Sequence, residues 1–105
     1  MDLTELKCDK THFWDVWTGA KTHEVRYNDR HYAVGDLLVL KETLYSYKSM
    51  EMDSETYPLQ YTGREILVEV THILRDNVIS VALREDWCVL SIKVLTKKAP
   101  AGGGV

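Results

Sequence analysis

Residues 19–26 read GAKTHEVR, which gives the spacing G-x-K-x-x-E-x-R. The glycine at its start is typical of a left-handed helix end, and residues 22–27 alternate as a strand does. Glu24 and Arg26 lie two residues apart and therefore project from the same face of that strand. Lys21 stands at the strand entrance, within reach of the same space. The segment predicts the end of a helix, the start of a strand and one cluster of charged side chains.

Two interpretations of this charged cluster follow from its chemistry. Glu24 and Arg26 can form an ion pair, or they can offer an acceptor and a donor fork to a ligand. Partial dehydration beside Arg26 would favour the neutral form of Lys21, which could then act as a base or nucleophile. Charged residues near one strand also form ordinary surface ion pairs that contribute little energy. The spacing alone favours the surface interpretation.

The residues before the motif predict a short strand followed by a short helix. Residues 2–8 are interpreted as extended. Asp9 or Thr11 can cap the helix by accepting hydrogen bonds from exposed backbone N–H groups. The apolar side chains that follow at helical spacing predict one buried helix face. They are Phe13, Val16, Trp17 and Ala20.

The residues after the motif predict turns and further strands. Residues 28–36 are rich in turn formers, and the apolar run 37–40 predicts a strand covered on both faces. Residues 64–74 and 88–95 alternate as strands, whereas 78–83 is a weaker candidate. The faces predicted to be buried carry Ile66, Val68 and Val70 in the first of these strands and Cys88, Leu90, Ile92 and Val94 in the second. Such short strands with one or two helices predict an α+β fold whose sheet closes into a small barrel.

The remaining segments set the domain limits. Residues 43–62 are polar and aromatic, and we interpret them as a long excursion, either a loop or a hairpin. Residues 96–105, TKKAPAGGGV, predict a flexible C-terminal tail. One domain therefore spans residues 1–95, as expected for a chain of 105 residues of which 45% are hydrophobic.

Charge and composition exclude several classes of function. The net charge of −3 lacks the basic footprint of a protein that binds long nucleic acid duplexes. Residues 21–31 carry three basic and two acidic side chains, whereas residues 42–55 carry four acidic side chains and one lysine, which would repel phosphate. The four histidines lack the spacing of a metal site, so we expect neither metal nor cofactor.

The cysteines and the apolar segments bear on location. Cys8 and Cys88 form no C-x-x-C pair, and we interpret both as reduced, buried side chains. Residues 1–20 lack the apolar run of a signal peptide, and no stretch has the length to span a membrane. We therefore expect a cytoplasmic protein without a membrane partner.

Several segments together resemble a known family. They are ELKC, GAKTHEVR, RYNDRHYAVGDLLVLKE, YTGREILVEVTHIL and WCVLSI, within residues 5–93. Their order and spacing resemble an uncharacterised bacterial and phage subfamily of the ASCH domains, which form a branch of the PUA-like superfamily. The resemblance implies a small PUA-like β-barrel with one or two short helices, over residues 1–95, and a cleft beside the motif.

The resemblance also implies candidate activities. ASCH domains are proposed to bind RNA or nucleotide-like ligands in this cleft. One bacterial branch hydrolyses acetylated cytidine with a Lys, a Thr and a Glu; Lys21 matches that lysine, Glu24 occupies the position of the Thr, and the later Glu has no counterpart here. Another branch is linked to ribonuclease activity.

Our first hypothesis for function is a binding module. Lys21, Arg26 and Arg30 would recognise RNA or a single nucleotide, and Glu24 would accept hydrogen bonds from a base edge. Four other residues are candidates with an alternative structural role: Asn28 and Asp29 as a turn, Lys7 as a solvated surface side chain, and Trp87 as a base platform or as a seal on the barrel end.

Two further hypotheses stay open. The protein could be a small hydrolase of a modified nucleoside or of RNA, in which Lys21 activates water or substrate and Glu24 moves protons. It could instead be an interaction protein, for instance a phage accessory protein, that binds a partner through the tyrosines and methionines of residues 43–62. The sequence leaves the oligomeric state open.

Overall fold

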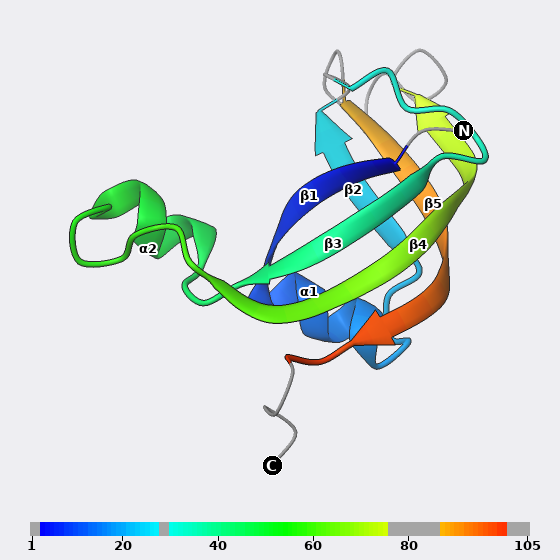
Figure 1. Cartoon of the computed structure of the whole chain (residues 1–105). Coiled ribbons are helices and arrows are strands. Elements are labelled where there is room, and N and C mark those ends of the chain that lie inside the picture. Colours follow the sequence, from blue (N-terminus) through cyan, green and yellow to red (C-terminus); the bar gives the residue numbers. More distant parts are fainter. Residues whose placement is uncertain (1–2, 28–29, 76–86, 101–105) are drawn as a thin grey trace.

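The computed structural model describes residues 3–27, 30–75 and 87–100, which form one five-stranded sheet with two short helices (Figure 1). In chain order the elements are β1 (Leu3–Asp9), α1 (Lys10–Trp17), β2 (His23–Tyr27), β3 (Leu37–Thr43), α2 (Tyr47–Met52), β4 (Tyr61–Arg75) and β5 (Trp87–Lys98). The predicted α+β class is confirmed.

The sheet has the strand order β1-β3-β4-β5-β2, so that β1 and β2 form its two edges. β1 is parallel to β3, and every other neighbouring pair is antiparallel. Figure 1 shows the sheet curled into a half-barrel, with α1 across one end. The curl brings the two edge strands toward each other and leaves an open seam between them.

The helix after β1 forms as the sequence predicts, but it ends at Trp17, so Ala20 lies outside it and is exposed. The Asp9 carboxylate caps α1 by accepting from the Thr11 N–H at 2.9 Å. Phe13 and Val16 are buried under the sheet. Gly19 follows with a left-handed φ of 86°, which a residue with a Cβ seldom adopts, and the chain turns there toward β2.

The core lies inside the curl of the sheet. Ile66, Val68 and Val70 of β4 are all fully buried, as their alternation predicts. On β5 the predicted face is buried as far as Ile92, whereas Val94 is exposed. Each fully buried aliphatic side chain stabilises the fold by about 1.5–3 kcal/mol, so this face holds the half-barrel together.

The expectation of a strand covered on both faces is wrong for residues 37–40. Leu38 and Leu40 are fully buried, but Leu37 and Val39 are only half-buried. In the described part of the chain, the outer face of β3 is not covered by a complete second layer. The apolar run 37–40 therefore packs against the core on one side only.

The excursion contains more regular structure than a loop or a hairpin. α2 begins after Ser46, whose hydroxyl accepts from the Ser49 N–H at 3.1 Å. Figure 1 shows α2 projecting away from the sheet. At the other end of the chain, β5 continues through Lys98, which pairs with Glu65, so the strand extends three residues beyond the predicted domain end at 95.

Two other expectations concern the cysteines and the membrane. Cys8 and Cys88 are both buried thiols, as predicted. Within the ranges that the structure describes, no helix combines the length and apolarity needed to cross a bilayer. The weak strand candidate at 78–83 lies outside the described residues.

Candidate ligand-binding site

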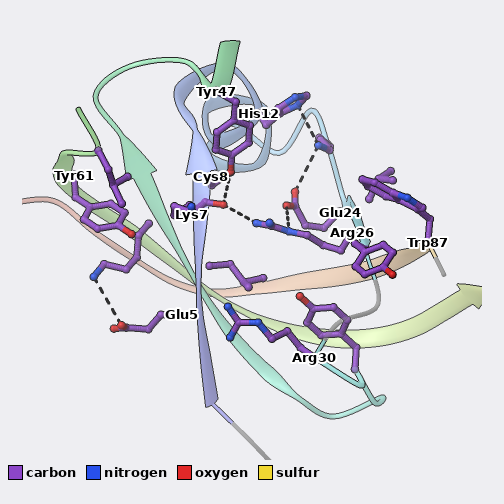
Figure 2. Close-up of a pocket in the computed structure, with 17 residues that line it drawn as sticks. Glu5, Lys7, Cys8, His12, Glu24, Arg26, Arg30, Tyr47, Tyr61 and Trp87 are labelled. Carbon is purple, nitrogen blue, oxygen red and sulfur yellow. Dashed lines mark hydrogen bonds and ion pairs between the residues drawn. The ribbon is translucent and has the colours of Figure 1, made fainter. Parts of the chain in front are cut away.

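A cleft of about 830 Å³ lies along the open seam of the sheet (Figure 2). Residues 5–8 of β1 and residues 24–27 of β2 contribute to its lining. These strands are the two edges of the sheet, so the cleft occupies the place where a closed barrel would have its last ladder of hydrogen bonds. Its size falls in the range of about 300–1,000 Å³ that is usual for small-molecule sites.

The charged motif residues meet at this cleft. Arg26 Nε donates to Glu24 Oε2 at 3.1 Å, and Lys21 Nζ lies 3.6 Å from Glu24 Oε1. Glu24 is only 5% exposed. The prediction that Glu24 and Arg26 share a face is confirmed, and the surface-pair interpretation is wrong because a carboxylate this buried depends on its cations for compensation.

Arg26 also connects the two edges of the sheet. Its Nη2 donates to the backbone carbonyl of Lys7 on β1 at 2.6 Å, and the Tyr47 hydroxyl donates to the same carbonyl at 2.5 Å. Figure 2 shows both bonds converging on this one oxygen. Side-chain hydrogen bonds therefore bridge the open seam between β1 and β2 and fix the distance between these strands.

Tyr47 ties the excursion to the site. Its backbone N–H donates to Asp9 Oδ2 at 3.1 Å, while the other oxygen of Asp9 caps α1. Burial raises the pKa of the Tyr47 hydroxyl to about 12, so the group remains a donor at physiological pH. One aspartate thus positions α1 and α2 together at the rim of the cleft.

Cys8 lines the cleft but is a poor nucleophile. Burial raises the pKa of its thiol to about 12, and the Glu24 carboxylate adds to the effect. A thiol must lose its proton to attack an electrophile. Cys8 therefore serves packing at the floor of the site.

His12 joins the charged cluster from the first turns of α1. Its Nδ1 lies 3.4 Å from Lys21 Nζ, so the Lys21 ammonium stands between an imidazole and the Glu24 carboxylate. His12 is not among the predicted site residues. Its place beside Lys21 depends on the reversal of the chain at Gly19, which residue spacing does not predict.

Cations outnumber anions along the cleft, although the chain as a whole carries a net charge of −3. The lining includes five basic side chains against two acidic ones. The basic ones are Lys7, Lys21, Arg26, Arg30 and Lys41, and the acidic ones are Glu5 and Glu24. A concave surface with one dominant sign of charge concentrates ligands of the opposite sign.

Aromatic side chains complete the lining. Trp87 and Tyr27 pack edge to face with ring centroids 6.0 Å apart, and Trp87 is 36% exposed. Trp87 therefore lines the cleft, and its roles as a base platform or as a seal on the barrel end stay predictions. Arg30 lines the cleft too, just before His31, whose left-handed φ of 51° is uncommon for a residue other than glycine.

The structure brings together every predicted site residue that it describes. Lys7, Lys21, Glu24, Arg26, Arg30 and Trp87 all line the same cleft. Asn28 and Asp29 lie outside the described residues. The cleft residues that the sequence did not predict include Cys8, His12, Lys41, Tyr47 and Tyr61. The sequence places Tyr47 and Tyr61 in the excursion, for which a partner surface is one alternative. A helix brings Tyr47 to the cleft and strand pairing brings Tyr61 there, and neither is visible in their local sequence.

Comparison with known proteins assigns the chain to a family. The family described as Domain of unknown function (DUF3850) matches residues 3–92, which is most of the chain, and the protein belongs to this family. No curated protein shows significant similarity to it.

Proposed function

Starting from membership of this family, we propose that the protein is a PUA-like module of the ASCH type that binds RNA or a nucleotide-like ligand at the seam of its sheet. The observation that carries the proposal is the composition of the cleft, where a cationic excess and exposed aromatic rings surround one buried carboxylate. In such a site the cations match a phosphate, the aromatic rings match the face of a base, and the carboxylate matches the edge of a base.

The cationic side chains would take the phosphate. The Arg26 guanidinium is fixed by Glu24 and by the Lys7 carbonyl, so it is preorganised as a donor. Arg30 and Lys21 line the same cleft and add positive charge. Guanidinium groups suit this role because their donors form a planar fork that matches phosphate oxygens.

Glu24 would read the edge of a base. Within the described residues its Oε1 accepts no hydrogen bond, although it is buried and the Lys21 ammonium lies 3.6 Å away. A buried acceptor without a hydrogen bond costs about 1–3 kcal/mol. An amino or imino N–H of a base would supply the missing bond and convert that cost into affinity and selectivity.

Hydrolysis of a modified nucleoside is the second candidate. Lys21 Nζ lies between the Glu24 carboxylate and the His12 imidazole, and such a chain of titratable groups can move a proton during hydrolysis. We also propose that the protein acts in the cytoplasm, because both of its cysteines are reduced thiols.

Calorimetric titration of the purified protein tests the proposal. The panel contains nucleoside monophosphates, acetylated cytidine and short single-stranded RNAs, and chromatography of each mixture detects product. Arg26→Gln should weaken binding about 10- to 100-fold, since charged hydrogen bonds are worth about 1.5–3 kcal/mol. Lys93→Gln makes the same charge change at an exposed position of β5 outside the cleft and should bind as the wild type does.

Three outcomes discriminate between the hypotheses. Binding without product, lost in Arg26→Gln alone, supports a recognition module. Product that requires Lys21, tested with Lys21→Ala, supports the hydrolase. An absence of both signals across the panel contradicts the proposal and directs the search to a protein partner of the excursion, where Met52 and Leu59 are exposed.

A further inference from the structure

A second aromatic and cationic pair lies on the other side of β1 from the charged motif. Lys41 Nζ stands 4.5 Å from the centroid of the Tyr61 ring, and Glu5 Oε1 lies 3.9 Å from the same ammonium. Figure 2 shows Tyr61 and Glu5 on one side of β1, with Arg26, Arg30 and Trp87 on the other. Both groups belong to one continuous cleft.

Strand register places two cations where the cleft passes over β1. Lys7 of β1 pairs directly with Lys41 of β3, so their side chains leave the same face of the sheet as neighbours. Like charges opposite each other destabilise a sheet. Glu5 offsets this only weakly, because its side chain is two-thirds exposed. An anion above β1 would relieve the repulsion between the two lysines.

The cleft therefore offers an aromatic platform, a row of cations and a second aromatic platform. Trp87 with Tyr27 forms the first, and Tyr61 forms the second. Aromatic rings that stack bases, separated by side chains that contact the backbone, are the usual means of binding single-stranded nucleic acid. The cleft reaches from Trp87 on one side of β1 to Tyr61 on the other, so a ligand confined to one platform leaves the other unoccupied.

We infer that the ligand is a single-stranded oligonucleotide of at least two nucleotides, which crosses β1 and places its bases on the two platforms. One base stacks at Trp87 near Glu24, the phosphate backbone passes Lys7 and Lys41, and the next base stacks on Tyr61. This inference rests on the proposed function, and it names the length of ligand and a second subsite that a single nucleotide would leave empty.

A length series of single-stranded RNA tests the inference directly. Mono-, di-, tri- and tetranucleotides of one sequence are titrated into the wild type and into Tyr61→Ala. In the wild type the affinity should rise at least about tenfold between one and three nucleotides, which is the usual contribution of one stacked base. In Tyr61→Ala this increment should vanish, while the affinity for the mononucleotide stays within about twofold.

Two matched variants show whether the lost increment comes from the missing Tyr61 ring, and not from a damaged fold or from the loss of any exposed tyrosine. Tyr61→Phe keeps the ring and should keep the increment. Tyr57→Ala removes a similarly exposed tyrosine that packs on Tyr45 in the excursion and does not line the cleft, so the length series should not change.

Lys41→Gln should reduce the salt dependence of trinucleotide binding, because it removes one phosphate contact.

The outcomes keep the inference distinct from the function on which it rests. Binding of the mononucleotide with no gain from added length overturns the inference and leaves the proposed function in place. A gain that persists in both Tyr61→Ala and Lys41→Gln overturns it as well. Failure to bind an RNA of any length overturns the proposed function together with the inference.

Discussion

Two glutamates, Glu24 and Glu42, are buried in the described part of this fold, and each is paired with an arginine. Glu24 is 5% exposed and contacts Arg26 Nε at 3.1 Å. Glu42 is fully buried, accepts from Arg64 Nε at 2.7 Å and also accepts from the Thr62 hydroxyl at 2.6 Å. The two pairs have the same chemistry but lie in different surroundings.

The difference lies in what surrounds each arginine. The Arg64 guanidinium packs against the Trp14 ring, whose centroid lies 4.9 Å away, and lies outside the cleft. Arg26 instead faces a cleft, and it shares its carboxylate with Lys21. An ion pair outside the cleft supports the structure, whereas one at the cleft can exchange part of its interactions with a ligand. The comparison teaches that position at the cleft, more than pairing, distinguishes a site from a structural ion pair.

Removing the arginine that pairs with the buried Glu42 should have the largest effect. Arg64→Met keeps the length of the side chain but leaves a buried carboxylate without its cation. Loss of one partner of a buried pair costs about 3–5 kcal/mol. Urea unfolding followed by circular dichroism measures this cost. Arg64→Lys retains the charge and should lose less, and a loss below about 1 kcal/mol in Arg64→Met would contradict the assignment of Glu42 as dependent on Arg64.

Alkaline pH should weaken the seam through Cys8. Burial raises the pKa of this thiol from 9.0 to about 12, so the unfolded chain loses the proton first. The stabilising contribution is complete below pH 9 and disappears as the pH rises toward 12. The free energy of unfolding should fall by about 1 kcal/mol between pH 8 and pH 10 from this group.

A matched variant isolates the contribution of Cys8 from other titrating groups. Cys8→Ala should unfold with a shallower dependence on pH over the same interval, whatever its stability at pH 8. Burial also raises the pKa of Tyr47, to about 12, which adds a smaller loss at the upper end. Equal slopes for the wild type and Cys8→Ala would show that the thiol does not titrate in this way.

Glu24→Gln should have the smallest effect on stability and a clear effect on binding. Arg26 keeps the Lys7 carbonyl, and water in the cleft can solvate its remaining donors. We expect a cost of at most about 1 kcal/mol, the net value of an ordinary hydrogen bond. Glu42→Gln should cost more in the same unfolding experiment. A larger cost for Glu24→Gln would place both carboxylates in the same structural class.

Much of the framework follows from local sequence because local physics decides it. The Asp9 cap, the left-handed Gly19 and the alternation of Ile66, Val68 and Val70 each depend on neighbours within a few residues. The pairing of Glu24 with Arg26 was predictable for the same reason, since a strand places residues two apart on one face.

The rest depends on contacts between distant segments. Glu42 was counted with the acidic side chains of residues 42–55 that would repel phosphate, but Arg64, 22 residues later, buries and compensates it. The partner of Arg26 across the seam is a backbone carbonyl, which has no signature in the sequence. Tyr47 and Tyr61 reach the cleft through a helix and a strand start that their polar, aromatic segment did not reveal.

The strand order has a consequence for when the cleft exists. β1 and β2 are consecutive strands in the chain but occupy opposite edges of the sheet, so they meet only after β3, β4 and β5 have completed the path around the curl. A partly assembled sheet has no seam to close. A ligand held there would stabilise the whole sheet by mass action, and slower hydrogen exchange in the buried amides of β4, well away from the motif, would report its presence.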